Sequence, residues 1–533
     1  MLAAVDTFAR DLKSERLAAC EAAHVRGAQT EEILRLQTLC LDQRELRLAA
    51  LLQEFEHAGP AMIERAVEAT EGLPRVEGCR DEEALLRAAP PPEDPETIGK
   101  AKAIQDELAR AGVLLDAARP HEALEIAEAQ LTVARALEHP PALADAAYEV
   151  GRALIEIGSG EQLDRADALL REAGDLAERA QDDTLAAECW TALVRLSARR
   201  SSDKEMGYRH AEKAFSAIER SGSDPALRVR ALHETGILCS LGGRTEDAER
   251  TLRDAVDLAE KNEVGAMLRA DGWRLLAGVL RERGRFAEAR EAFETVAQIE
   301  RDTLGEEHPR LASTKHDHAL FLLEQGDTGG ARRLLQQAIA IHARALADDD
   351  LRRSRPLTAL GILEDSQERY AESLSAHEQA LAVQLRAVGD GDLLTVRSRG
   401  HIAQALLMLR RMEDAGTQLD LYEQGIDRHL DALPRDRALA CKLRGQWWIA
   451  RADRAQAIAT LTRGRALVEG SRGDPLDLAE IHWLLSRAYL ESGARDQVRG
   501  RMFAGSARAL FAAGGSAGER RERALDGWLR AAR

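Results

Sequence analysis

Aromatic residues are scarce in this chain of 533 residues, and so are the patterns that form β-sheets. Phe, Trp and Tyr together make up 4% of the sequence, and there are 14 prolines. No run of β-branched residues alternates with polar ones, which is the usual sign of a strand. Because Ala, Leu, Arg and Glu dominate instead, the composition predicts an all-α protein.

Closely spaced cysteines and long apolar runs are also missing. The six cysteines form no Cys-x-x-Cys pair, a spacing that argues against a zinc site. No stretch approaches the roughly 20 apolar residues of a membrane-spanning helix. The first ten residues lack the basic start and apolar core of a signal peptide. We therefore expect a soluble cytoplasmic protein with reduced thiols.

Lysine is rare, and acidic side chains outnumber basic ones, 91 to 74. The formal net charge is −17, which argues against nucleic acid as a partner and favours solubility. The charge is uneven, with 11 basic and 20 acidic side chains in residues 1–98 but 19 and 11 in residues 435–533. A basic C-terminal end can meet an acidic partner or the acidic N-terminal region of a second copy, so self-association is possible.

Catalytic motifs are missing as well. There is no Gly-x-Ser-x-Gly, no His-Glu-x-x-His, and no Lys in the glycine-rich stretch 514–518 to make it a phosphate loop. Cys441 has no nearby His to activate it. His316 and His318 are two residues apart on a predicted helix, so we expect one in the packed face and the other on the groove. The sequence thus predicts no enzyme activity, no cofactor and no metal.

What the sequence does contain is a repeat. A small residue and, twelve positions later, a second one recur about every 42 residues, and two upstream versions are stretched. The pairs are Ala111/Ala123, Gly151/Ala166, Val194/Ala211, Gly236/Ala248, Ala277/Ala289, Ala319/Ala331, Gly361/Ser373, Ala403/Ala415, Gly445/Ala457 and Ser486/Val498. Small side chains let two helices pack closely, so each pair predicts one antiparallel helical hairpin in a stacked array.

The repeat divides the chain into four regions. Residues 1–87 precede it and contain predicted helices over 3–24, 30–57 and 61–71, with Thr30 as the N-cap of the second. Residues 88–97 are a linker rich in proline and acidic residues. The array follows over residues 98–511, with helix stops in its turns at Gly243, Gly284, Gly326 and Gly493. Residues 512–533 are a flexible joint and a capping helix anchored by Trp528.

This spacing resembles the tetratricopeptide repeat. Trp273, Leu276, Ala277, Leu280, Gly284 and Ala289 follow its pattern, and the stretch 303–312 resembles the 42-residue variant of kinesin light chains. The resemblance implies about ten helical hairpins in a right-handed α-solenoid. That variant usually has Asn in the first helix to hold the backbone of a bound peptide. Here Asp317 occupies the position, and Asn262 is the only Asn in the chain.

The N-terminal region resembles the segment that joins bacterial serine/threonine protein kinases to their tetratricopeptide repeats. The matching residues are Ala19, Cys20, Arg26, Gly27, Gln29, Thr30, Cys40, Leu41, Arg44, Leu73, Pro74 and Cys79. The kinase motifs themselves are absent from this sequence. The resemblance implies the regulatory half of such a kinase. If that half came from a membrane kinase, its location would be extracytoplasmic, where Cys20 and Cys40 would be exposed to oxidising conditions. Hairpin geometry nevertheless places Cys20 nearer Leu34 than Cys40, so we expect no bond between the two cysteines.

The first helix of each hairpin lines the inner wall of such an array, which locates a candidate binding groove. The predicted groove residues are Arg230, His233, Arg274, Arg281, His316, Asp317, Arg355, Arg397, His401, Gln404, Lys442, Trp483 and Arg487. Because guanidinium groups bind carboxylates and phosphates in bidentate fashion, an arginine-rich groove suits an anionic partner. One hypothesis is a scaffold that docks an acidic protein segment. The alternative is a sensor that binds a small, nucleotide-like anion and regulates an effector protein.

Overall fold

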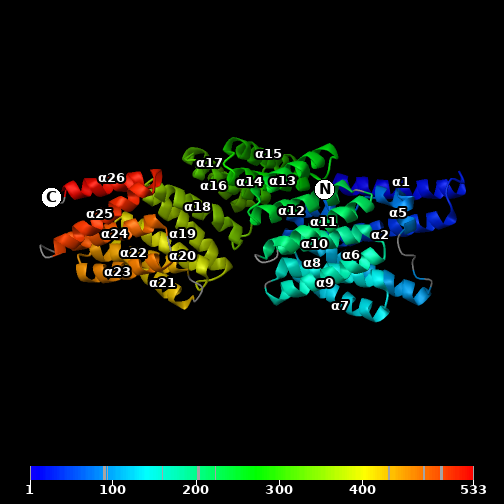
Figure 1. The fold of residues 1–533 in the computed structure, drawn as a ribbon, viewed down its shortest axis with the longest axis horizontal. Helices are drawn as coiled ribbons and strands as arrows, with labels where there is room; N and C mark the ends of the chain where they lie inside the picture. The colour runs from blue at the N-terminus through cyan, green and yellow to red at the C-terminus, as the bar shows by residue number, and fades with distance from the viewer. Residues whose placement is uncertain are drawn as a thin grey trace. The chain divides into compact units, whose positions relative to one another are not determined.

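The computed structural model describes residues 2–87, 92, 94–158, 160–200, 204–222, 224–429, 433–471, 474–491 and 496–531. Within these ranges every regular element is a helix, from α1 to α26 with two short 3-10 helices (Figure 1). The all-α prediction is therefore confirmed. The chain divides into two compact units, Met1–His308 (unit 1) and Pro309–Arg533 (unit 2).

The first two N-terminal helices follow the sequence prediction, and the segment after them differs from it. They are α1 (Leu2–His24), α2 (Glu31–Glu56), α3 (Pro60–Glu64), α4 (Ala66–Glu71), the 3-10 helix η1 (Glu77–Arg80) and α5 (Glu82–Arg87). Thr30 caps α2 as predicted, because its hydroxyl accepts a hydrogen bond of 3.2 Å from the backbone N–H of Ile33. The single helix predicted over 61–71 is wrong, since it is interrupted at Arg65.

Two cysteines of this region are joined, which corrects the expectation of reduced thiols. Cys40 of α2 forms a disulfide with Cys79 of η1. The sequence prediction that Cys20 and Cys40 are not bonded is confirmed, because Cys20 is free and exposed. The disulfide ties the segment after α4 back onto α2, where Leu41 and Val76 pack with Leu12 in a small apolar cluster.

Ten antiparallel hairpins follow in the described chain, five in each unit. Unit 1 contains α6 (Pro95–Asp116) with α7 (Pro120–Leu137), α8 (Pro140–Ile157) with α9 (Glu161–Arg179), α10 (Asp183–Arg199) with α11 (Lys204–Arg220), α12 (Pro225–Leu241) with α13 (Thr245–Lys261), and α14 (Ala266–Glu282) with α15 (Phe286–Leu304). Unit 2 contains α16 (Pro309–Glu324) with α17 (Thr328–Ala345), α18 (Ser354–Ser366) with α19 (Tyr370–Ala387), α20 (Leu393–Met408) with α21 (Met412–Arg428), α22 (Pro434–Ala450) with α23 (Arg454–Ser471), and α24 (Pro475–Leu490) with α25 (Gln497–Ala513). The 3-10 helix η2 (Leu351–Arg353) precedes α18. Each predicted pair of small residues falls on the two helices of one hairpin, so the predicted hairpins are confirmed.

Small residues on the first helices make room for large side chains of the second helices. A Cβ atom added at Gly236 would lie 2.6 Å from Cγ of Leu252, and one at Gly361 would lie 2.5 Å from the ring of His377. The tenth pair corrects the sequence prediction. The side chain of Val498 is 82% exposed, whereas Gly500 takes the packed position against Leu490. The packed position in α25 is therefore Gly500 and not Val498, and the predicted stop at Gly493 lies outside the described residues.

The turns inside the hairpins use the left-handed backbone conformation. Gly243, Gly284 and Gly326 have φ values of 75°, 71° and 77°, which confirms their predicted role as helix stops. Arg410 and Ala452 adopt the same conformation in later hairpins, with φ values of 59° and 64°, although it is unfavourable for residues with a Cβ atom. The turn geometry is thus common to glycine and non-glycine hairpins.

Unit 2 ends in the helix α26 (Ser516–Ala531), which covers the last hairpin. The predicted anchor Trp528 is only partly buried, and the fully buried side chain is that of Leu525, which packs with Phe511. The joint before α26 is shorter than the sequence suggested, because α25 continues to Ala513. The predicted linker 88–97 lies partly outside the described residues, and α6 already begins at Pro95.

Candidate partner-binding face

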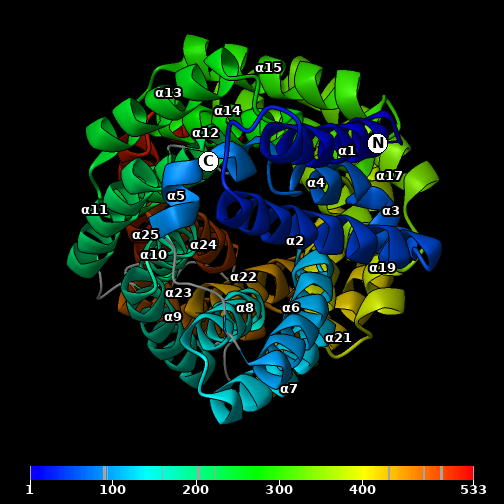
Figure 2. The ribbon, with the colours of Figure 1, turned by 90° about the vertical axis from the view of Figure 1, so that its right-hand side faces the viewer.

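In unit 1, the N-terminal helices occupy the face formed by the first helices of the hairpins. Helix α2 lies beside α1 and packs on α6, where Arg47 donates to the carbonyl of Ala109 at 3.1 Å (Figure 2). Burial lowers the pKa of Arg44, while the nearby carboxylates of Glu188 and Asp182 on α10 act in the opposite direction. The inner face of unit 1 is therefore partly filled by the chain itself.

Contacts from the next N-terminal helices extend this arrangement to the end of unit 1. The carboxylate of Glu71 in α4 accepts a hydrogen bond of 3.0 Å from the backbone N–H of Met267 in α14. An Nε2 atom of His308 lies 3.0 Å from the carbonyl oxygen of Glu64. The contact with Glu71 satisfies an N–H group at the start of α14, since the N–H groups in the first turn of a helix have no internal acceptor.

In unit 2, four consecutive first helices bring polar side chains together. We call Asp365 of α18, Gln404 of α20, Lys442 of α22 and Glu480 of α24 the inner row. Gln404 donates to Asp365, and Nζ of Lys442 lies 2.6 Å from Oε2 of Glu480. Burial raises the pKa of Asp365, whereas the hydrogen bond from Gln404 and the charge of Lys442 lower it. The charge of Glu480 also raises this pKa, so the four side chains of the row interact electrostatically. Two predicted groove residues, Gln404 and Lys442, thus lie in the same row.

Most cations predicted for this face already have carboxylate partners. Besides Glu480, Lys442 contacts Asp477 at 3.3 Å. Arg397 donates two hydrogen bonds, of 3.2 and 2.8 Å, to the buried carboxylate of Asp436. Such charge-assisted pairs are strong when they are shielded from water, so these two cations are largely compensated within the chain.

Arg355 differs from these two residues. It is exposed on α18 and has no hydrogen bond or ion pair to any residue that the structure describes. Burial, and to a smaller extent the charge of Arg355, lower the pKa of the neighbouring His316 to about 4. Both His316 and His318 are buried, at 7% and 8% exposure. The expectation that one of them faces the groove is therefore wrong.

The remaining predicted residues of unit 2 lie at several places on its first helices. The ring of His401 stacks on His377, with centroids 4.8 Å apart. Trp483 meets Phe511 edge to face at 6.2 Å, and Arg487 lies 4.0 Å from Glu491 in the last turn of α24. Asp317 is half-buried on α16. These contacts of His401, Trp483 and Arg487 lie within their own hairpin or the preceding one.

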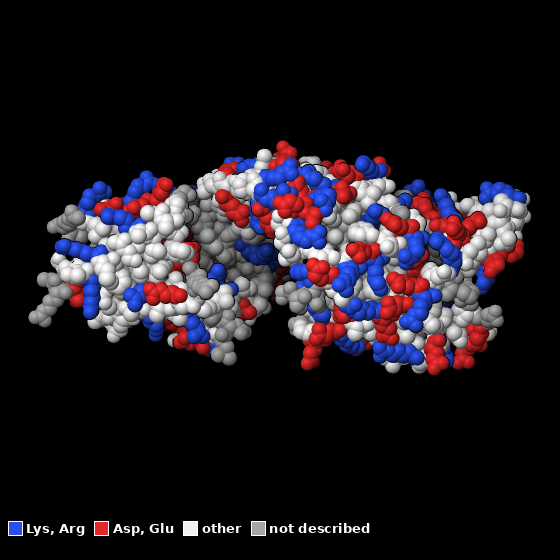
Figure 3. Space-filling model, in the orientation of Figure 1, with Lys and Arg blue, Asp and Glu red and all other residues white. Residues whose placement is uncertain are grey.

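The predicted groove residues of unit 1 form a smaller cluster. His233 of α12 is buried against Gly272 of α14, and burial, then Arg274, then Arg230 lower its pKa to about 4. Arg274 forms an ion pair with Asp271. Arg230 is exposed, and Arg281 lies in the last turn of α14. Figure 3 shows basic and acidic side chains intermixed on the face of unit 1 turned to the viewer.

Sequence reasoning did not identify Asp365 and Asp436, although both contact predicted residues. Members of the inner row occupy different positions in their repeats, since Asp365 follows the small residue Gly361 whereas Glu480 precedes Ser486. The row therefore runs diagonally across successive helices. A count at fixed repeat positions cannot find a diagonal row.

The described residues contain no group of three or more His, Cys, Asp or Glu side chains placed to hold a metal ion. Among the described helices, none combines the length and the apolar character that crossing a bilayer requires.

Comparison with known proteins identifies the repeat. The tetratricopeptide-repeat family model matches residues 268–344 and 310–384. No curated protein matches the sequence. Among solved structures, a putative kinesin light chain with nearly identical TPR-like repeats from Podosopora anserina is 23% identical over 39% of this chain and 99% of its own, with a TM-score of 0.35.

Two other solved structures cover more of the chain at lower identity. The apo form of the quorum sensor NprR from B. thuringiensis is 15% identical over 68% of this chain and 97% of its own, with a TM-score of 0.47. A Rap protein complexed with competence and sporulation factor is 12% identical over 76% and 99%, with a TM-score of 0.41. The matched residues 268–384 thus carry tetratricopeptide repeats, within a described chain whose ten hairpins share one arrangement.

Proposed function

We propose that this chain is a non-catalytic scaffold that binds a partner protein on the inner face of unit 2, as a regulatory module of bacterial kinase-type signalling. The inner row carries this proposal, because it brings polar side chains of four successive first helices together. Repeat arrays use such extended surfaces for binding. The N-terminal motif around Cys20, Arg26 and Cys40 supports the link to kinases.

An acidic segment is the partner chemistry that we propose. The exposed Arg355 provides a cation without a carboxylate partner among the described residues. Arg397 and Lys442 stay paired with Asp436 and Glu480, so Arg355 is the cation that an acidic chain would contact.

The two inner faces suggest which unit binds. In unit 1, α2 and α4 cover parts of the first helices, with Arg47 and Glu71 making direct contacts. In unit 2 the terminal helix α26 contacts both ends of the inner row, where Arg521 lies 2.8 Å from Glu480 and Arg520 donates to the carbonyl of Ser366 at 3.1 Å, but it leaves Arg355 exposed. We therefore assign the docking surface to unit 2.

The charge reversal Arg355→Glu tests this proposal. Arg333→Glu is the matched control, because Arg333 is an exposed arginine on the second helix α17. A partner captured from the source cell by the wild-type chain is purified, and its affinity for each variant is measured at two salt concentrations. We expect Arg355→Glu to weaken binding by about tenfold or more if the contact is desolvated, and binding to fall as salt rises. Equal binding by the two variants would show that the inner face is not the docking surface.

A further inference from the structure

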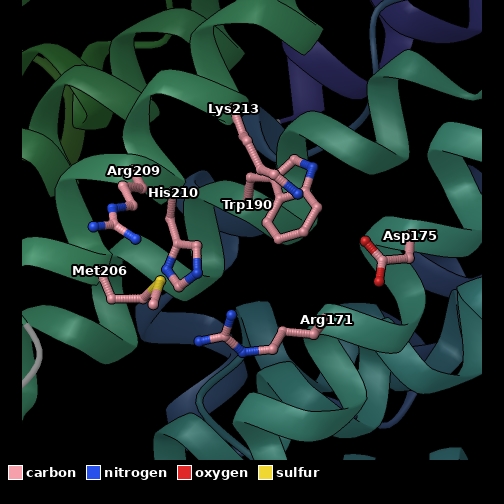
Figure 4. A pocket seen from close by; sticks show the side chains of 7 residues that line it. All are labelled: Arg171, Asp175, Trp190, Met206, Arg209, His210 and Lys213. Carbon is pink, nitrogen blue, oxygen red and sulfur yellow. The ribbon is translucent and has the colours of Figure 1, made fainter.

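A pocket of about 230 Å³ lies between α9 and α11, with α10 behind it (Figure 4). Both α9 and α11 are second helices of their hairpins, so this pocket is separate from the inner row and does not depend on the proposed docking surface. We call it the α9–α11 pocket. Its walls include Arg171 of α9, Trp190 of α10, and Met206, Arg209, His210 and Lys213 of α11.

A glycine and a tryptophan build the back of the pocket. A Cβ atom at Gly174 would lie 3.0 Å from Cζ2 of Trp190, so the missing side chain at Gly174 leaves room for the indole between α9 and α10. The indole N–H donates to Glu178 at 2.9 Å, which fixes the ring. Nζ of Lys213 lies 3.6 Å from the centre of this ring and is held there by a cation–π interaction. The ammonium group is thus positioned without a carboxylate partner.

Positive charge exceeds negative charge in the pocket. Arg171 extends from α9 toward His210 and is paired with Asp167 at 2.7 Å. Arg209 and Lys213 form no hydrogen bond or ion pair with the residues that the structure describes. Among the described residues that line the pocket, Asp175 is the one carboxylate. Such a surplus in a chain of net charge −17 marks a place where an anion is favoured.

The buried His210 adds a polar group that is poorly satisfied. It is 2% exposed and stacks on Trp190 with ring centroids 5.8 Å apart. Neither ring nitrogen has a hydrogen bond of good geometry to the described residues, and the backbone of Leu193 provides only a weak contact. A buried donor without an acceptor costs free energy, so a ligand with an acceptor atom in the pocket would gain a hydrogen bond from the His210 ring N–H.

Its titration is controlled by the surrounding charges. Burial and then Arg171 lower the pKa of His210 to about 4, and Lys213 acts in the same direction. Asp167 and a backbone contact with Leu193 oppose this shift. Because the ring is neutral near pH 6, an anion bound beside it would raise its proton affinity.

We propose that the α9–α11 pocket binds a phosphate monoester group, carried by a small molecule or by a phosphorylated side chain. A phosphate dianion offers several acceptor oxygens to the two guanidinium groups, the ammonium group and the imidazole, whereas a carboxylate has a single charge and two oxygens. Pockets for drug-sized ligands are about 300–1,000 Å³. The smaller volume here suits the phosphate group with little attached to it.

Isothermal titration calorimetry of the full chain tests the site. The probes are inorganic phosphate, phosphoserine, a phosphoserine-containing peptide and acetate. We expect the three phosphate probes to bind more tightly than acetate. Tighter binding of the peptide than of phosphoserine would identify a phosphoprotein as the source, and equal binding a small molecule. Acetate binding as tightly as phosphate would overturn the assignment.

Substitutions at the rim separate binding from folding. Lys213→Gln and Arg209→Gln each remove one exposed cation, and Lys261→Gln removes an exposed lysine of α13 as the matched control. We expect phosphate binding to weaken by about tenfold for each rim variant, the usual effect of losing a charged contact. Affinity equal to that of Lys261→Gln, or no binding of any phosphate probe to the wild-type chain at millimolar concentration, would refute the site.

Discussion

Adding one methyl group at Gly236 should destabilise its hairpin, while the same change at Gly278 should not. In Gly236→Ala the new Cβ atom would lie 2.6 Å from Cγ and 2.7 Å from Cδ2 of Leu252, far inside the usual carbon–carbon contact of about 3.5–4.0 Å. In Gly278→Ala it would meet no atom within 4 Å. Both glycines lie inside first helices, α12 and α14 of unit 1.

The paired design isolates the packing effect. Replacing glycine by alanine inside a helix stabilises it by about 1 kcal/mol, and this gain is common to both variants. Overpacking costs about 1–3 kcal/mol and applies only at Gly236. We therefore expect Gly278→Ala to stabilise its hairpin and Gly236→Ala to be less stable than Gly278→Ala by about 1–3 kcal/mol.

Hydrogen exchange resolved by peptide is the appropriate assay, because hairpins in an array open locally. Protection should fall in α12 and α13 for Gly236→Ala and stay unchanged in α6 and α7. Truncating the facing side chain in Leu252→Ala should remove the penalty, so the two changes together should show a favourable coupling of about 1–3 kcal/mol. Equal protection in the two glycine variants would refute the close approach of α12 and α13 at this point.

Three further outcomes are expected. Because the pKa values of His233 and His377 lie at about 4 and about 3 in the folded chain, below the ordinary value of about 6.5, the unfolded chain binds more protons. Stability should then be constant above pH 6.5 and fall below it, by up to about 2 kcal/mol per histidine at pH 5; urea unfolding midpoints that do not change between pH 7.5 and 5 would contradict this. Gly284→Ala should destabilise its turn by about 1–2 kcal/mol, since φ at this position is 71°, and thermal denaturation with Gly278→Ala as reference measures it. Cys40→Ser opens a loop closed over a separation of 39 residues and should cost the N-terminal helices about 2–4 kcal/mol, seen as lost protection in α2; full protection there would show that the bond to Cys79 is dispensable.

The sequence by itself determined the helices, their pairing and most of their ends. A helix boundary depends on neighbouring residues, so Thr30 as a cap and Gly243 or Gly284 as a stop are readable from local patterns. The hairpins were predictable for a related reason. Two adjacent helices must approach closely at one level, and pairs such as Gly236 and Ala248 record that requirement at nearly constant spacing.

Only the tertiary structure decided which residues from different hairpins meet. Cys79 reaches Cys40 because the chain turns back after α4, and the spacing of the cysteines contains no sign of it. The α9–α11 pocket and the inner row bring together side chains from two to four hairpins. Each hairpin is rotated against the next, so residues such as Asp365 and Glu480 become neighbours from unequal repeat positions. That rotation results from packing between hairpins, and the spacing of the repeats along the sequence does not predict it.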